Sequence, residues 1–126
     1  MRLQNIVGAL LYVICCVSVQ AKSLDDYPRR DTPEASIYRG DLVFHNYCQL
    51  CHGPNADGMG RAAKMYNPKP ANLRKSTYPT SYKEMIVRRG GKEMGRSEFM
   101  PPWGEELTDE QITDVVHYID TLVEKP

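Results

Sequence analysis

The chain has 126 residues, with 16 Lys plus Arg against 16 Asp plus Glu and 41% hydrophobic residues. This length is typical of one domain rather than two. A formal net charge of zero gives no overall case for binding nucleic acid or an anionic membrane surface, because proteins recruited by either are usually basic. The charged fraction of 25% is ordinary for a folded protein, so wholesale disorder is not expected either.

The first 21 residues have the pattern of a secretory signal. A cationic start precedes the apolar run 6–19, and the Val-Gln-Ala before Lys22 fits a small-residue cleavage site. The run is shorter than the roughly 20 residues that a membrane-spanning helix needs. We therefore expect export to the periplasm, removal of residues 1–21 and no stable membrane insertion afterwards. An uncleaved N-terminal anchor is the alternative.

The rest of the chain divides into two parts. Residues 22–35 form a polar leader, which is either disordered or in contact with a partner. Residues 36–126 carry the periodic apolar patterns of a folded domain. One folded domain is therefore predicted to follow the signal and the leader.

The two cysteines of this domain carry its chemistry. Cys48-Gln49-Leu50-Cys51-His52 is a Cys-x-x-Cys-His sequence, the attachment signal of c-type haem. Two thiols at this spacing can add to the two vinyl groups of a porphyrin, and the adjacent imidazole can then reach the iron. Cys48 and Cys51 are therefore predicted to attach one haem c covalently, with His52 as the proximal ligand.

Three other interpretations of the cysteines remain. A thioredoxin-like dithiol lacks its βαβ context here. A zinc site would have to use His45, Cys48, Cys51 and His52, two of them adjacent in sequence and without a second cluster. A disulfide across so short a loop would stabilise the fold little. The Cys-x-x-Cys-His signal is strong in an exported chain, so haem attachment is the favoured interpretation.

The second axial ligand decides between electron transfer and chemistry on a small ligand. The candidates are His45, His117, Met59, Met65, Met85, Met94 and Met100. His117 projects away from the apolar stripe of its predicted helix, and Met85 is predicted to face the core. Met94 and Met100 both lie in a predicted loop, but only Met100 is followed by two prolines that stiffen the backbone. Met100 is therefore the predicted distal ligand.

Three helices and long loops are predicted, with no strand, so the fold class is all-α. The first helix spans residues 36–47 and places Gly40 and Phe44 on one face. A glycine inside a helix costs about 1 kcal/mol relative to alanine, so we expect another helix to approach closely there. Residues 54–80 lack clear regular structure and are expected to wrap the haem edge.

The other two helices are marked by their ends. The second is predicted to begin at Ser81, with a capping box to Glu84, to end at Gly90-Gly91 and to point Met85 inward. The third has a predicted capping box of Thr108 and Gln111, a hydrophobic staple of Leu107 and Ile112, and one continuous apolar face.

With these pieces assembled, the chain resembles the small monohaem class I cytochromes c of bacterial periplasms. The resemblance covers residues 36–126 and implies a cytochrome c-like fold wrapped around one covalently attached haem, with His52 and Met100 as axial ligands. It also implies that Tyr118 of the last helix crosses Gly40, and that a carbonyl of the loop at Pro68 and Pro70 accepts the Nδ1 proton of His52. Both prolines fit that role.

The function implied is one-electron transfer between periplasmic or membrane-bound redox proteins, without a catalytic site of its own. A haem subunit of a larger dehydrogenase or oxidase is the first alternative. A haem protein that binds small ligands after displacing Met100 is the second. Trp103 is predicted either to pack on the ring or to donate a hydrogen bond to a propionate.

Charge is unevenly distributed along the neutral chain. Residues 61–96 contain ten Lys or Arg and two acids, whereas residues 98–124 contain eight acids and no Lys or Arg. We expect the basic segment to border the haem edge and to steer acidic redox partners, which raises the association rate more than the affinity. Solvated faces without a partner are the alternative.

Overall fold

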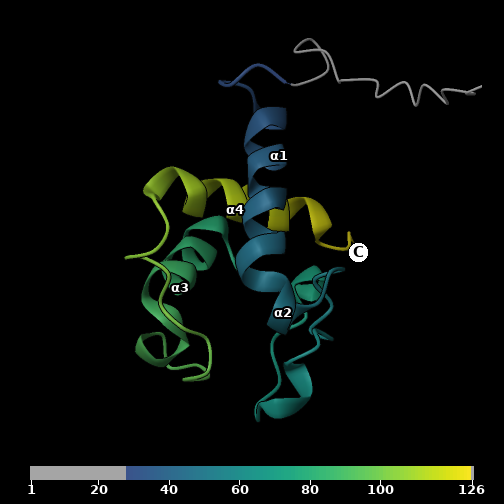
Figure 1. Ribbon diagram of the computed structural model, residues 1–126, viewed down its shortest axis with the longest axis vertical. Helices are drawn as coiled ribbons and strands as arrows, with labels where there is room; N and C mark the ends of the chain where they lie inside the picture. Colours follow the sequence, from purple (N-terminus) through teal and green to yellow (C-terminus); the bar gives the residue numbers. More distant parts are fainter. Residues whose placement is uncertain (1–27, 126) are drawn as a thin grey trace, which may run out of the picture.

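The computed structural model describes residues 28–125, which contain helices, turns and loops but no strand. Figure 1 shows the long helix α1 (Pro33–Val43) upright, with α4 (Asp109–Leu122) crossing it and α3 (Thr80–Glu93) below α4. The predicted all-α class is confirmed for this part of the chain. The predicted signal, residues 1–21, and the leader up to residue 27 lie outside the described residues. No helix within 28–125 has the length and apolarity to cross a membrane.

The first helix is longer at both ends than predicted. Thr32 caps it, since Ala35 N donates to Thr32 Oγ1 at 3.2 Å, and Pro33 occupies the first turn. The predicted start at residue 36 missed this Thr-Pro signal. Beyond Val43 the helix continues as one wider π-helical segment, η2 (Phe44–Cys48), and a last turn, α2 (Gln49–His52). The Cys-x-x-Cys-His sequence therefore forms the helical end of this first unit.

α1 and α4 cross in direct backbone contact at Gly40. A Cβ atom added to Gly40 would lie 2.0 Å from the carbonyl oxygen of Asp114 and 2.9 Å from Tyr118 Cβ. One turn further along, the rings of Phe44 and Tyr118 lie 5.5 Å apart. The predicted crossing of Tyr118 over Gly40 is confirmed, and only glycine fits there.

The core lies at this crossing. Its fully buried large side chains are Phe44, Ile112, Val115 and Val116. The Thr108–Gln111 capping box is present in both directions, at 2.9 and 3.2 Å, as predicted. Leu107 is buried in the same cluster as Ile112, in agreement with the predicted staple.

One buried carboxylate in this interface escaped the sequence analysis. Asp114 is only 3% exposed and accepts hydrogen bonds from Ser36 Oγ at 2.6 Å and from Arg39 Nε and Nη2 at 2.6 and 3.0 Å. A buried charge is tolerated only when it is paired and hydrogen-bonded, as it is here. His117 is exposed, as predicted, and its Nδ1 lies 2.8 Å from Ser36 Oγ. These bonds fasten the start of α1 to α4.

α3 differs from the prediction at its start and in its orientation. It begins at Thr80 after Pro79, without a side-chain cap, so the predicted Ser81–Glu84 capping box is wrong. Glu84 instead accepts from Thr113 Oγ1 of α4 at 3.2 Å. The predicted inward position of Met85 is also wrong: Met85 is 40% exposed, whereas Val87 is buried. The two residues are about 200° apart around the helix, so both cannot face α4.

Residues 54–80 contain only two single turns, η3 (Ala63–Met65) and η4 (Leu73–Lys75), and are otherwise loop as predicted. At the other end of α3, Gly90 leaves the helical conformation with φ 77° and ψ 169°, and one more turn follows to Glu93. The predicted helix end at Gly90-Gly91 is therefore wrong by about one turn, although Gly90 does adopt the positive φ that was expected of a glycine there.

Replacing Gly40 by alanine tests the helix crossing. The added Cβ must push α1 and α4 apart, and we expect Gly40→Ala to lower the free energy of unfolding by about 3 kcal/mol. Gly95→Ala is the control, because no heavy atom lies within 4 Å of its added Cβ and only its φ of 66° opposes the change; about 1 kcal/mol is expected there. Guanidinium denaturation measures both. Equal losses would contradict the crossing.

Candidate functional site

The first helical unit, residues 33–52, carries Cys48, Cys51 and His52 in its last two turns. We call this end of the unit, together with the loop that follows it up to residue 79, the α2 arm. Both cysteines are free, Cys48 buried and Cys51 half-buried. Burial, with a smaller contribution from Cys51, raises the pKa of the Cys48 thiol to about 12. The two thiols are therefore not joined as a structural disulfide, and Cys48 is held in the protonated form.

The His52 imidazole is oriented by the backbone. Its Nδ1 lies 3.0 Å from the carbonyl oxygen of Ala71, so Nδ1 carries the proton and donates it. Burial lowers the pKa of His52, and the bond to Ala71 offsets only part of that shift. The neutral ring is thus fixed with Nε2 as its free acceptor nitrogen, the arrangement of a metal-ligating histidine.

The carbonyl that accepts from His52 belongs to Ala71, so the prediction that Pro68 or Pro70 supplies it is wrong. The Pro70 carbonyl faces Gly58 instead, where an added Cβ would lie 2.6 Å from it. The carbonyl of the next residue, Ala71, is the one that accepts from His52 Nδ1. The loop was identified correctly and the residue was not.

The chain after His52 folds back over the end of α2. Gly58 N donates to the His52 carbonyl at 2.8 Å, Gly60 N to that of Cys51 at 3.2 Å, and Ala62 N to that of Leu50 at 3.0 Å. These bonds satisfy carbonyls that a helix end leaves without partners. At Gly60 an added Cβ would lie 2.3 Å from the Leu50 carbonyl oxygen. The two glycines therefore allow the loop to hold the Cys-x-x-Cys-His turn closely.

Met100 lies in the loop that follows α3 and packs along its end. We call α3 and this loop, residues 80–104, the α3 arm. Gly91 N donates to the Met100 carbonyl at 2.8 Å, and Trp103 N and Gly104 N donate to the carbonyls of Val87 and Arg88 at 2.9 and 3.1 Å. The latter two carbonyls lie beside the break at Gly90. An added Cβ on Gly91 would lie 2.0 Å from the Ser97 carbonyl oxygen. The Gly90-Gly91 pair therefore provides a flat backbone surface on which the Met100 loop is fastened.

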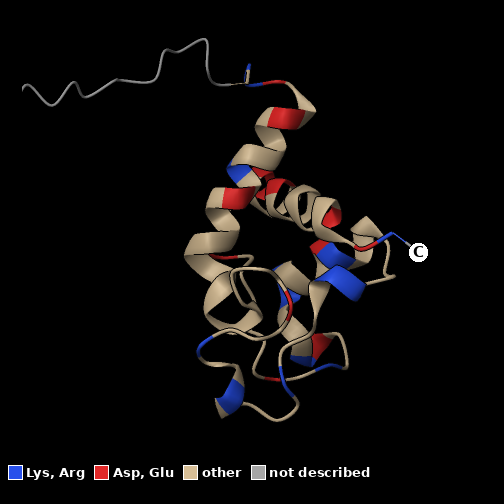
Figure 2. Cartoon of the chain, turned by 90° about the vertical axis from the view of Figure 1, so that its right-hand side faces the viewer, with Lys and Arg blue, Asp and Glu red and all other residues tan. Residues whose placement is uncertain are grey.

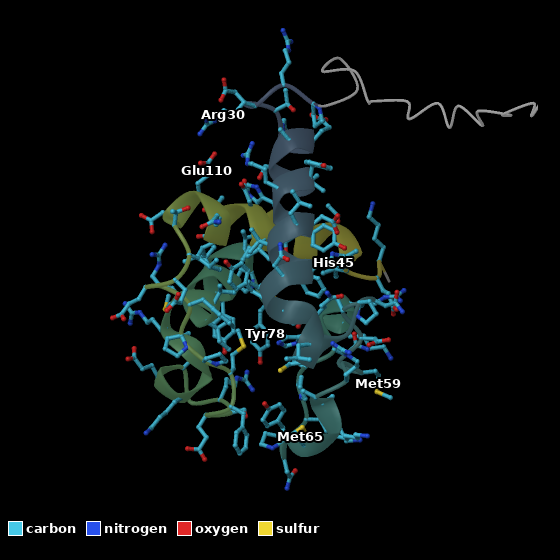
Figure 3. The ribbon with its side chains drawn as sticks, viewed as in Figure 1. Arg30, His45, Met59, Met65, Tyr78 and Glu110 are labelled. Atoms are coloured by element: carbon cyan, nitrogen blue, oxygen red, sulfur yellow. The ribbon has the colours of Figure 1, made fainter. Side chains whose placement is uncertain are left out.

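The other candidate ligands differ in exposure and partners. Met59 and Met65 are 71% and 74% exposed, and Figure 3 shows Met59 pointing outward from the molecule. Met94 and Met100 are half-buried. His45 Nδ1 lies 2.9 Å from an Asp41 carboxylate oxygen. Among residues 28–125 no group of three or more His, Cys, Asp or Glu is arranged to hold a metal ion, so the zinc interpretation finds no site there.

Aromatic and apolar side chains surround the two arms. Trp103 packs against the core, and its ring lies 5.5 Å from that of Tyr47 in an edge-on arrangement. Tyr47, Leu50 and Phe99 are all more than 40% exposed, although they are large and apolar. Free thiols, an oriented neutral imidazole and exposed apolar side chains together fit a haem, whose macrocycle is apolar and whose iron needs a nitrogen ligand.

Comparison with known proteins agrees with this chemistry. The model of the family described as cytochrome c oxidase, cbb3-type, subunit III matches residues 35–119. Among solved structures, a chain of the Kuenenia stuttgartiensis reducing HAO-like protein complex Kustc0457/Kustc0458 is similar, with 25% sequence identity and a TM-score of 0.57. The similarity covers 68% of this chain and 41% of that one, so this chain spans less than half of its structural neighbour. No curated protein matches.

The family match extends over all of α3, the Met100 loop and the Cys-x-x-Cys-His turn, and reaches into α4 as far as Ile119. The sequence motif, the helical fold and the family therefore agree. This chain belongs to the cbb3-type cytochrome c family and is a small c-type cytochrome, a haem-based electron-transfer protein.

Proposed function

We propose that this cytochrome is a one-electron carrier with a single haem, attached through Cys48 and Cys51 and ligated by His52 and Met100. The observation that carries the proposal is the His52 imidazole, neutral and oriented by Ala71 within a Cys-x-x-Cys-His turn. The haem supplies the reversible ferric–ferrous couple. The protein's residues bind it, orient its ligands and set their electrostatic surroundings.

The two arms have different tasks in this proposal. Ala71 orients the proximal imidazole and makes it a stronger base, as hydrogen-bond acceptors on ligating histidines do. The glycine pair and the prolines hold the Met100 loop, which suits a ligand that must remain in place when the iron changes charge. A thioether favours the reduced metal, so His/Met ligation raises the reduction potential. No acid or base is required.

Cysteine replacement tests covalent attachment. In Cys48→Ala/Cys51→Ala we expect no haem to remain on the polypeptide after acid–acetone extraction, whereas the wild type keeps one haem per chain by mass spectrometry. Cys15→Ala/Cys16→Ala controls for export alone, since both cysteines lie in the segment 1–21 that is proposed to be removed, and it should keep one haem per chain. Haem that survives extraction from the Cys48→Ala/Cys51→Ala protein would overturn the attachment.

Carbon monoxide tests the distal ligand. The ferrous wild type should bind it slowly, because a protein ligand occupies the sixth position, and Met100→Ala should bind it at least about a hundredfold faster once this competition is removed. Met94→Ala, changed in the same loop, should behave like the wild type. Flash photolysis measures the rates. Fast binding by the wild type would instead support the small-ligand function.

A second candidate function is that of an electron-transfer subunit within a larger redox complex. It is favoured by the description of the family as an oxidase subunit and by the structural neighbour, which comes from a protein complex. Gel filtration of a native extract separates the two: a free carrier elutes near its own mass of 14.4 kDa or less, and a subunit elutes with its complex.

We further propose export to the periplasm through residues 1–21 and electron exchange with acidic redox proteins. Folding neutralises part of the basic segment, because Arg74, Lys83 and Arg88 pair with acids at 3.2, 2.6 and 2.6 Å. Arg61, Lys64 and Lys69 make no ion pair within 28–125 and line one hollow beside exposed Met59. Figure 2 shows several basic residues on the lower loops, and acidic residues on α1 and α4 among other places. This hollow is the proposed docking surface.

Charge removal tests this surface. In Arg61→Gln/Lys64→Gln, oxidation by hexacyanoferrate(III), an anionic oxidant, should slow about threefold to tenfold at low ionic strength and little at high salt. Arg29→Gln/Arg30→Gln removes the same charge at the opposite end of α1, where Figure 3 labels Arg30, and should slow the reaction less. Stopped-flow absorbance measures the rates. Equal effects of both double variants would contradict local steering.

A further inference from the structure

Arg96, Tyr78 and Tyr82 form a cationic cluster that joins the Met100 loop to the start of α3. The two phenol rings stack, with centroids 4.4 Å apart and planes 23° apart. Arg96 Nε donates to the Tyr82 hydroxyl at 3.1 Å, Arg96 Nη2 donates to the Tyr78 hydroxyl, and the guanidinium carbon lies 5.1 Å from the centre of the Tyr78 ring. The arrangement is specific and was not foreseen from the sequence.

The hydrogen-bond roles in this cluster leave several donors free. Both phenol oxygens accept from Arg96, so both hydroxyl hydrogens remain available for donation. Neither hydroxyl donates to another group among residues 28–125. Arg96 uses only two of its N–H groups on the phenols, and a guanidinium has more. The cluster therefore presents hydroxyl and guanidinium donors together.

The positive charge of the cluster lacks a carboxylate partner. The acids nearest to Arg96 in sequence are Glu93 and Glu98, and neither forms an ion pair with it; no other acid in the described residues does so either. Arg74, Lys83 and Arg88 of the same basic segment all have carboxylate partners. A guanidinium that donates to two phenol hydroxyls and has no acid paired with it can still bind a carboxylate from outside the polypeptide.

The cluster lies where the two arms of the site approach each other. The backbone of Arg96 is fastened to α3, with Arg96 N donating to the Gly91 carbonyl at 2.7 Å. The next residues reach the other arm, because the Phe99 ring lies 5.1 Å from that of Tyr66. Arg96 lines one hollow together with Asn67 and Pro68 of that arm; Glu98 also lines this hollow but forms no ion pair with Arg96. Figure 3 shows Tyr78, which belongs to the end of the α2 arm, between the ribbons of the two arms.

We propose that Arg96, Tyr78 and Tyr82 bind a carboxylate between the two arms, and that this carboxylate is a propionate of the haem. The inference rests on the proposed function and adds a third point of attachment to it. The two propionates of a haem lie on the edge opposite the vinyl groups, which Cys48 and Cys51 would hold. A group that binds propionate must therefore come from segments other than the Cys-x-x-Cys-His turn, as all three residues do.

Such a contact has a measurable electrostatic consequence. A guanidinium beside a propionate keeps the carboxylate ionised and partly cancels its negative charge. Without Arg96, the uncompensated negative charge stabilises the ferric state, and the propionate takes up a proton in the neutral pH range as the iron is reduced. The reduction potential then falls and becomes dependent on pH.

The test is spectroelectrochemistry of the holoprotein between pH 5 and 8. In Arg96→Gln, the ratio of ferrous to ferric protein at a fixed potential and pH 8 should fall roughly tenfold, and the potential should acquire a pH dependence that the wild type lacks. The double variant Tyr78→Phe/Tyr82→Phe keeps the charge and loses the hydroxyl donors. Its ratio of ferrous to ferric protein should therefore also fall, but by a smaller factor. Arg89→Gln removes an exposed arginine of the same segment and should change the ratio less than about twofold.

Two outcomes overturn the proposal. In the first, Arg96→Gln retains His/Met ligation, but its reduction potential has the same value and pH dependence as that of Arg89→Gln. If Arg96→Gln then alters only the association rate with a redox partner, the carboxylate belongs to that partner. In the second, Arg96→Gln loses Met100 ligation, while the reduction potential of Tyr78→Phe/Tyr82→Phe depends on pH as that of the wild type does. The cluster would then only hold the Met100 loop in place. Failure of the proposed function is distinct from both, because the wild type itself would then lack a covalent haem or His/Met ligation.

Discussion

The contact of α1 with α4 at Gly40 is the constraint on which the rest of this cytochrome depends. The two backbones touch, so no side chain other than hydrogen fits between them. Phe44 and Tyr118 pack one turn further along, and the buried Asp114 with Ser36 and Arg39 fixes the other side of the crossing. With the helix angle fixed in this way, the end of the first helical unit, which carries Cys48, Cys51 and His52, is directed away from α4 and toward the long loop (Figure 1).

The sequence was most informative where a local pattern has one physical meaning. The Cys-x-x-Cys-His turn, the glycine within a helix and the capping box at Thr108 each require only their neighbours to be interpreted, and the crossing and the box are present as predicted. α3 was predicted less well because Ser81 and Met85 fit a helix in more than one phase. Its actual phase is set by Val87 against α4, a contact between residues distant in sequence.

The loops could not be predicted in the same detail, because their function depends on where single backbone groups point. The choice of Ala71 over Pro68 and Pro70 follows from the contact of the Pro70 carbonyl with Gly58. Gly90-Gly91 looked like a helix end, yet its main role is to accept the Met100 loop at close range. The Arg96 cluster joins residues 14 and 18 positions apart whose spacing has no periodic meaning. Ligation by Met100 links these loops to the Cys-x-x-Cys-His turn in our proposal.

The optical spectrum of the ferric protein tests the central claim most directly, because iron bound to a thioether gives a weak far-red absorption band. We predict that the wild type shows this band, that Met94→Ala retains it and that Met100→Ala loses it while its haem stays attached. A wild type without the band, or a Met100→Ala protein that keeps it, would contradict His52/Met100 ligation and with it the role we assign to the loop fastened on Gly90-Gly91.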